Sequence, residues 1–149
     1  MRDCFAVYLL KSLKCIARTF GYIIIVCLIF STGHTESHHP QDFLKSIKGA
    51  PDEGEQIYNH FCVNCHALKP LIPLGAPRKG ELGDWKERLK QGFDVLFKHT
   101  DEGFNAMPAR GGCFECTDEQ LGLSIITMVP KEAQKDLLNA LRDYKKYKE

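Results

Sequence analysis

The stretch that organises this chain is His60-Phe61-Cys62-Val63-Asn64-Cys65-His66, which contains a Cys-x-x-Cys-His motif. Two cysteines at this spacing lie on one helical turn, so both thiols can add to the two vinyl groups of one porphyrin. The histidine that follows is placed to bind the iron as an axial ligand. The motif therefore predicts one covalently attached c-type haem, with thioether bonds at Cys62 and Cys65 and His66 on the iron.

Two other interpretations of the cysteines are a thioredoxin-like redox pair and half of a zinc site. A second Cys-x-x-Cys pair at Cys113 and Cys116 brings the number of thiols to four, the count of a structural zinc site. However, 47 residues separate the two pairs, whereas zinc sites of this type use about 15–20. His66 would also have no role at such a site. A zinc-stapled secreted binding module is thus the remote alternative.

The first 33 residues have the pattern of a secretory signal. Basic residues precede an 11-residue apolar run at 20–30, and the small residues Ser31, Thr32 and Gly33 follow it. This run is shorter than the roughly 20 residues that span a bilayer as a helix. We expect a cleaved signal at 1–33, with an uncleaved anchor as the other outcome, and a periplasmic location, either free or anchored at the outer face of the inner membrane.

Composition supports this division. Three of the seven cysteines fall within 1–33, which leaves two Cys-x-x-Cys pairs beyond it. An oxidising compartment allows a disulfide to persist. Without the four basic and one acidic residues of 1–33, the chain retains 16 basic and 18 acidic residues, a net charge of −2. This balance, with no dense basic block, excludes a nucleic-acid binder.

Hydrophobic periodicity predicts an all-α fold, with no strand signal beyond the apolar run. We expect an N-terminal linker at 34–49, a haem domain at 50–129 and an additional amphipathic helix at 130–149. Within the haem domain, helices are predicted over 52–65, from Asp84 and after Thr117, and Gly92 is a position where the second can split. Two capping boxes support these starts, Asp84 with Glu87 and Thr117 with Gln120.

An irregular loop at 69–83 is rich in proline and glycine. Its apolar side chains are candidates to cover one face of a macrocycle. They are Leu68, Leu71, Ile72 and Leu74.

Met107 is the candidate for the second axial ligand. It lies in a loop, precedes Pro108 and follows His66 by 41 residues. A thioether on such a loop can reach the iron, and His/Met ligation raises the reduction potential. Met128 lies on the apolar face of a helix, where methionine is ordinarily a gap-filler. His99 is the rival imidazole. A local disulfide between Cys113 and Cys116 would constrain the loop that carries Met107.

The order of these motifs resembles class I cytochrome c, and is most similar to the bacterial cytochrome c-five group. The resemblance covers about residues 52–129. It rests on Gly54-Glu-x-Ile-Tyr58, the Cys62–His66 motif, Gly75-Ala-Pro-Arg78, Asp84-Trp85, Gly103-Phe-Asn-x-Met107-Pro-x-x-Gly111-Gly112 and Cys113-x-x-Cys116.

The resemblance implies His66 and Met107 as axial ligands and a Cys113–Cys116 disulfide. It also implies that the Pro77 carbonyl accepts the proximal imidazole N–H, and that Trp85 lies near the haem propionates. About twenty residues extend beyond the usual end of the family.

The expected function is that of a monohaem electron carrier rather than an enzyme. Two protein ligands leave no open iron position, so single electrons would pass to and from redox partners such as respiratory complexes or a terminal oxidase. The alternative is a haem enzyme subunit or ligand sensor with an open iron position. Membrane contact is expected only through partners or an uncleaved signal. Candidate docking cations are Lys69, Arg78, Lys79, Lys86, Arg88 and Arg110.

Overall fold

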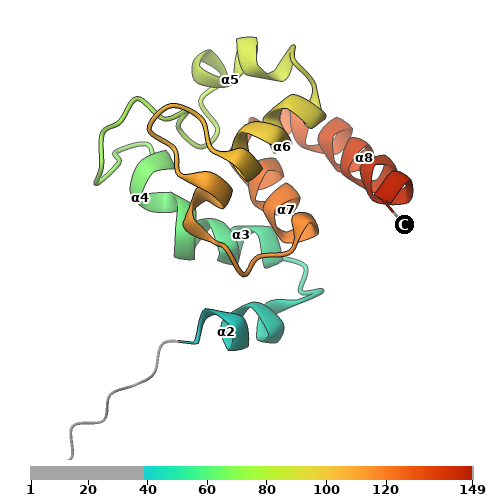
Figure 1. The fold of residues 1–149 in the computed structure, drawn as a ribbon. Helices are drawn as coiled ribbons and strands as arrows, with labels where there is room; N and C mark the ends of the chain where they lie inside the picture. The colour runs from blue at the N-terminus through green and yellow to red at the C-terminus, as the bar shows by residue number, and fades with distance from the viewer. Residues whose placement is uncertain (1–38, 149) are drawn as a thin grey trace, which may run out of the picture. The chain divides into compact units, whose positions relative to one another are not determined.

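The computed structural model describes residues 39–148 of the 149-residue chain. The expected signal at 1–33 and residues 34–38 of the expected linker lie outside the described residues. The part described is built of helices joined by loops, without a β-strand (Figure 1), as the sequence predicts. In chain order the elements are α2 (Pro40–Ile47), α3 (Glu53–Ile57), the π-helix η1 (Tyr58–Cys62), α4 (Val63–His66), α5 (Leu82–Leu89), α6 (Phe93–Glu102), the 3-10 helix η2 (Ala109–Gly112), α7 (Asp118–Met128) and α8 (Lys131–Lys148).

The Cys-x-x-Cys-His motif lies at the end of a continuous run of helical turns, but this run is not the single α-helix predicted over 52–65. The chain passes from α3 into the π-helical turn η1 before α4 begins. A π turn takes in an extra residue, and such turns are frequent at functional sites. Ile57 and Tyr58 are buried where the turn widens. Compared with an uninterrupted α-helix, the π turn therefore rotates the cysteines and His66 about the helix axis relative to this buried pair.

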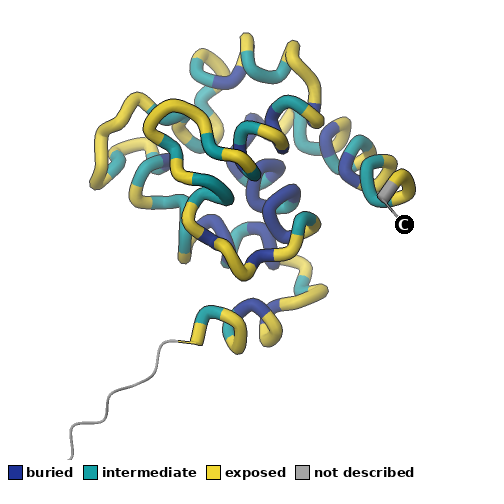
Figure 2. Tube along the Cα trace, in the orientation of Figure 1, coloured by how far each residue is buried: buried dark blue, intermediate teal, exposed yellow. Residues whose placement is uncertain are grey.

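Helix α3 crosses α7 at close range, and Gly54 permits the approach. A Cβ atom on Gly54 would lie 2.6 Å from the Leu123 carbonyl oxygen and 2.7 Å from the Thr127 hydroxyl oxygen. Only glycine leaves room for backbones this close. Helix α7 forms the centre of the core, visible as the dark blue helix in Figure 2. Its buried residues are Gln120, Leu121, Gly122, Ser124, Ile125, Ile126 and Met128.

Of the two capping boxes that the sequence predicts, the structure contains one. At the start of α7, the Thr117 hydroxyl accepts from the Gln120 backbone N–H, and the Gln120 side chain accepts from the Thr117 N–H. The prediction that Asp84 caps α5 is wrong, because α5 begins at Leu82 and has no side-chain cap. The Asp84 carboxylate binds Arg78 instead. Gly92, with φ +81°, separates α5 from α6.

Residues 40–47 form α2 rather than the linker predicted over 34–49. Leu44 and Ile47 are buried in the core. The Gln120 side-chain nitrogen donates to the Leu44 carbonyl at 3.2 Å, which fastens the helix to α7. Phe43, Leu44 and Ile47 recur at helical spacing after Pro40 in the first turn, a local helix pattern that the linker prediction passed over.

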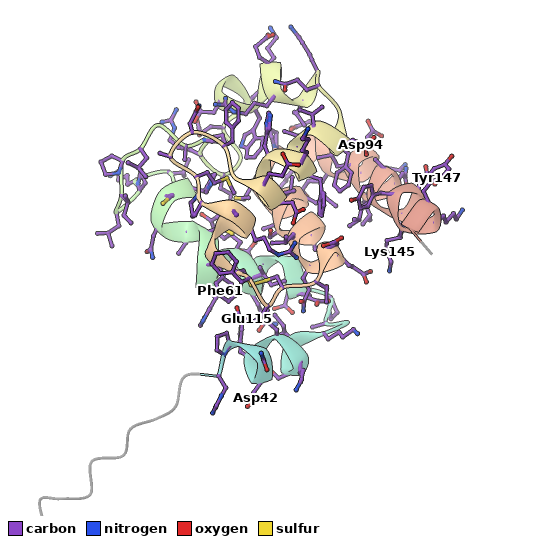
Figure 3. The ribbon with its side chains drawn as sticks, viewed as in Figure 1. Asp42, Phe61, Asp94, Glu115, Lys145 and Tyr147 are labelled. Carbon is purple, nitrogen blue, oxygen red and sulfur yellow. A yellow bond between two sulfur atoms is a disulfide. The ribbon has the colours of Figure 1, made fainter. Side chains whose placement is uncertain are left out.

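The C-terminal segment forms α8, which packs on α6 and α7. Leu141 lies over Gly122, where a Cβ atom would come within 2.6 Å of it. The Tyr144 ring lies 5.0 Å from the Phe97 ring, measured between centroids. Tyr147, labelled in Figure 3, is 91% exposed by contrast. Apolar contacts therefore hold α8 against the domain along one face.

Candidate functional site

His66 ends α4 in a buried position with one ring nitrogen already engaged. It is 6% exposed, and its Nδ1 lies 2.8 Å from the Pro77 carbonyl oxygen. A carbonyl oxygen can only accept, so Nδ1 carries the proton and Nε2 keeps the lone pair that a metal would bind. Burial lowers the pKa of His66, the Pro77 hydrogen bond opposes this, and Arg88 lowers the pKa further. The neutral imidazole, which is the metal-binding form, is favoured.

Cys62 and Cys65 are free thiols at the end of η1 and within α4. Both are half-buried. Burial raises the pKa of the Cys62 thiol to about 11, although a hydrogen bond with Ser124 on α7 lowers it. Two reduced thiols one turn apart, followed directly by a neutral imidazole, are the donor set that covalent haem c requires. The residues present therefore fit this group, with the two sulfur atoms standing in place of the thioethers of the haem-bound protein.

Residues 77–80, here called the Pro77 strap, pass beside His66 with their backbone polar groups engaged. The Lys79 N–H donates to the His66 carbonyl at 2.8 Å, and the Gly80 N–H donates to the Met128 carbonyl at 2.8 Å. The Arg78 carbonyl accepts from the Trp85 indole N–H at 2.8 Å. Hydrogen bonds to the backbone of the strap therefore join it to α4, α5 and α7.

Two ion pairs add side-chain attachments to the strap. The Arg78 guanidinium binds both oxygens of Asp84, at 2.7 and 3.1 Å. The Lys79 ammonium lies 2.6 Å from both carboxylate oxygens of Glu55 and 4.2 Å from the centre of the Tyr58 ring. The sequence carries no local signal for the Glu55–Lys79 pair, since 24 residues separate its members. The six-residue spacing of Arg78 and Asp84 was a weak signal for the other pair.

Trp85 is 3% exposed, and its single N–H donor is bound to the Arg78 carbonyl. The resemblance placed this residue near the haem propionates. The structure shows a hydrogen bond to the strap that supports His66, and the position of Trp85 near the propionates stays a prediction. A cavity of about 320 Å³ lies beside the strap. Its lining includes Pro70, Pro73, Pro77, Arg78, Asp84 and Arg88.

Met107 lies half-buried in residues 103–112, here called the Met107 loop. Two backbone hydrogen bonds join Phe104 and Met107, at 2.9 and 3.1 Å. Gly103 has φ +87°, and a Cβ there would lie 2.8 Å from the Met107 carbonyl oxygen. The end of the loop forms η2, which lies against η1, the turn that ends at Cys62. The fold therefore brings the segment after Met107 next to the Cys-x-x-Cys-His motif.

Arg110 fastens the Met107 loop to its neighbours. Its guanidinium binds Asp101 at the end of α6, the Cys116 carbonyl at 2.6 Å and Asp118 at 3.3 Å. Arg110 is thus a structural cation and not the exposed docking residue predicted from the sequence. A buried disulfide joins Cys113 and Cys116 directly after the loop. Because this bond uses two of the four thiols, the four-thiolate zinc site is not formed.

The rival ligands occupy other environments. Met128 is buried in the core. The His99 ring stacks on Phe104 at 4.1 Å. Within residues 39–148, no group of three or more His, Cys, Asp or Glu side chains is arranged to hold a metal ion.

The apolar side chains predicted to cover a macrocycle are exposed in this structure, Leu71 at 79%. They lie on the loop that extends between α4 and α5 in Figure 1. Their packing against a haem face therefore stays a prediction. The other three are Leu68, Ile72 and Leu74.

Known proteins match the part of the chain that contains this site. The family model for the cbb3-type cytochrome c oxidase subunit III matches residues 49–123. Cytochrome c5 of Azotobacter vinelandii is 34% identical over 79 residues, which cover 52% of this chain and 92% of that protein. Cytochrome c5 of Ectopseudomonas mendocina is 34% identical over 85 residues, covering 56% and 94%. Cytochrome c-555 of Prosthecochloris aestuarii is 32% identical over 84 residues, covering 51% and 82%.

The family-model match begins before α3 and includes the Cys-x-x-Cys-His motif, in a helical domain whose free thiols and neutral imidazole suit covalent haem attachment. The chain therefore belongs to the class I cytochromes c, of the c5 type, a family of electron carriers with covalently bound haem c.

Proposed function

We propose that this cytochrome is an exported carrier of single electrons whose haem is held by Cys62 and Cys65 and ligated by His66 and Met107. The observation that carries the proposal is the Nδ1 contact of His66 with the Pro77 carbonyl, at 2.8 Å. This hydrogen bond uses Nδ1, so Nε2 is the nitrogen that remains to bind the iron. It also raises the basicity of the imidazole. The group supplies a one-electron ferric/ferrous couple when bound.

The roles of the chain's own residues follow from their positions. Cys62 and Cys65 would anchor the haem, and His66 and Met107 would both bind its iron, so no site would be left for a substrate. The Met107 loop is held by Arg110 and is adjacent to a disulfide, which supports a fixed rather than a displaceable thioether. This favours electron transfer over the alternative of an enzyme or sensor with an open iron position.

Export is proposed from the pattern of residues 1–33 and from the disulfide, which persists in an oxidising compartment. The proposed location is the periplasm. In the stretch from 39 to 148, no helix is long and apolar enough to cross a membrane.

Partner docking is proposed to be transient and aided by surface charge. Three of the six predicted cations, Lys69, Arg78 and Lys86, are exposed, and Lys69 and Lys86 lie close to the motif and to Trp85 in the sequence. Arg78, Lys79 and Arg110 are engaged in ion pairs. The proposed partners are a redox donor and acceptor, such as respiratory complexes or a terminal oxidase.

Absorption spectroscopy of the haem-loaded protein, with a redox titration, tests the ligation. We expect a low-spin spectrum with a c-type α-band when the protein is reduced. When it is oxidised, we expect a methionine-dependent absorption band at the red end of the visible spectrum, here called the near-red band. Met107→Ala should abolish the near-red band, and the control Met128→Leu, in the core, should retain it. A high-spin spectrum that shifts with carbon monoxide would favour an open iron position. A near-red band that survives in Met107→Ala would contradict the assignment of Met107.

A further inference from the structure

The two peptide units that follow Pro77 are each held at both ends. The first unit contains the Pro77 carbonyl, which accepts from His66 Nδ1, and the Arg78 N–H, which donates to the Asp84 carboxylate at 3.0 Å. The second contains the Arg78 carbonyl, which accepts from the Trp85 indole, and the Lys79 N–H, which donates to the His66 carbonyl. Because a peptide unit is planar, fixing its N–H also fixes the direction of its carbonyl.

We infer that Asp84 and Trp85 are positioning residues, which hold the Pro77 carbonyl on the His66 imidazole and so contribute to setting the reduction potential. The inference rests on the proposed ligation of the iron by His66. Neither residue touches the imidazole in the contacts described. Each acts through the backbone of Arg78, from the first turn of α5.

The position of Asp84 explains why it does not cap its own helix. Its two oxygens take three hydrogen bonds from Arg78, one from the backbone N–H and two from the guanidinium. The guanidinium therefore fixes the carboxylate, and the carboxylate fixes the peptide. Trp85, buried at the next position, fixes the following peptide from the same turn.

A held carbonyl has a defined effect on the iron. A histidine ligand that donates its second ring N–H to a firm acceptor is more basic, and a more basic ligand favours the ferric state. When the carbonyl is free to move, the ferric state loses part of this preference and the potential rises. The Nδ1 proton also becomes easier to exchange with water, since its acceptor separates from it more often.

The first test compares Asp84→Ala with Glu87→Ala in the haem-loaded protein. Both changes remove one carboxylate from α5, but the Glu87 carboxylate binds Lys90 at the surface, away from the strap residues in the contacts described. NMR of the reduced protein measures the exchange of the His66 Nδ1 proton. We expect exchange about fivefold faster in Asp84→Ala, the factor for losing one hydrogen bond that opposes opening. Glu87→Ala should exchange as the unaltered protein does.

The second test uses Trp85→Phe, which removes the donor, keeps an aromatic ring and changes no charge. We expect the ratio of reduced to oxidised protein at a fixed potential to rise about threefold, a positive shift of about 30 mV for one electron. The control is Phe97→Leu, a core truncation on α6 whose described ring contacts are with Phe93 and Tyr144. It should lower stability without this shift.

The outcomes separate the inference from the proposed ligation. An unaltered protein without an imidazole-ligated low-spin spectrum would contradict both. A normal spectrum, with proton exchange and potential unchanged in Asp84→Ala and Trp85→Phe relative to their controls, would overturn the roles of these two residues alone. If Trp85→Phe fails to fold, the proton exchange in Asp84→Ala decides.

Discussion

The Pro77 strap and the Met107 loop support opposite axial ligands of the proposed site, and they are held in different ways. In the strap, polar groups from α4 and α5 bind consecutive peptide units. In the Met107 loop, the backbone is joined mainly by the two hydrogen bonds between Phe104 and Met107 and by a turn at its end. Its path depends on residues with positive φ. These are Gly103, Asn105, Arg110, Gly111 and Gly112.

The difference implies different consequences of mutation. An attachment in the strap can be removed while the rest of the backbone keeps its allowed conformation, so the effect should appear at the iron before it appears in stability. A glycine with positive φ in the Met107 loop cannot be replaced by a residue with a side chain without strain in the backbone. Disturbing it should therefore release the proposed ligand and lower stability together.

Gly103→Ala should have the largest effect. Its φ of +87° disfavours any side chain, and the new Cβ would lie 2.8 Å from the Met107 carbonyl oxygen and 2.9 Å from the Ala109 nitrogen. We expect a loss of about 3 kcal/mol in the free energy of unfolding, together with loss of the near-red ferric band. Denaturant unfolding and the ferric spectrum measure both.

Gly83→Ala is the matched control, because Gly83 lies within α5 and a Cβ there meets no atom within 4 Å. It should be neutral or slightly stabilising. If Gly103→Ala keeps the near-red band and a stability close to that of Gly83→Ala, the conformational account of the Met107 loop is wrong.

Removing the disulfide should have the next largest effect. The double substitution Cys113→Ser with Cys116→Ser removes the buried bond that closes a four-residue ring directly after the Met107 loop. The loss in the free energy of unfolding should be about 2 kcal/mol, and the near-red band should disappear at a lower denaturant concentration than the haem α-band. Unchanged midpoints for both signals would show that the disulfide does not support the loop.

Local patterns predicted the parts of the fold and site that short-range chemistry determines. The Cys62–His66 motif, the Thr117–Gln120 capping box and the amphipathic pattern of α8 each involve residues within a few turns of one another. Their partners are close in sequence, so spacing alone carries the information. The same is true of the all-α fold class, which the helical periodicity indicates.

Contacts between distant segments were out of reach of these patterns. The Gln120–Leu44 hydrogen bond joins residues 76 positions apart, so no local pattern indicates that α2 packs against α7. Asp84 shows a second limit, since its position suits a helix cap and an ion pair equally well. The choice depends on where the loop brings Arg78, which the sequence does not encode locally.

Glu55→Gln should have a small effect, because the ion pair that it weakens is partly exposed. Side-chain exposure is 28% for Lys79 and 46% for Glu55. We expect a loss of about 0.5 kcal/mol at low salt, and less at high salt, by denaturant unfolding. Glu87→Gln, at a more exposed pair, is the control. A loss as large as that from removing the disulfide would mean that a single side chain, rather than several attachments together, holds the strap.

The smallest expected effect is a pH dependence confined to the strap. Hydrogen bonds from Arg78 hold the pKa of Asp84 at about 2, below its ordinary value of 3.8. A carboxyl group with a depressed pKa in the folded state stabilises the fold above its ordinary pKa, and this contribution is lost as the pH falls through about 2. The stability difference between the unaltered protein and Asp84→Ala should therefore be constant near neutral pH and shrink between about pH 4 and pH 2. Denaturant unfolding across this range measures it, and an equal difference at both ends would contradict the Arg78–Asp84 attachment.

The stability difference between the unaltered protein and Gly103→Ala should not change over this pH range, because a backbone conformation does not titrate. One pH series therefore distinguishes support by an ion pair from support by backbone conformation.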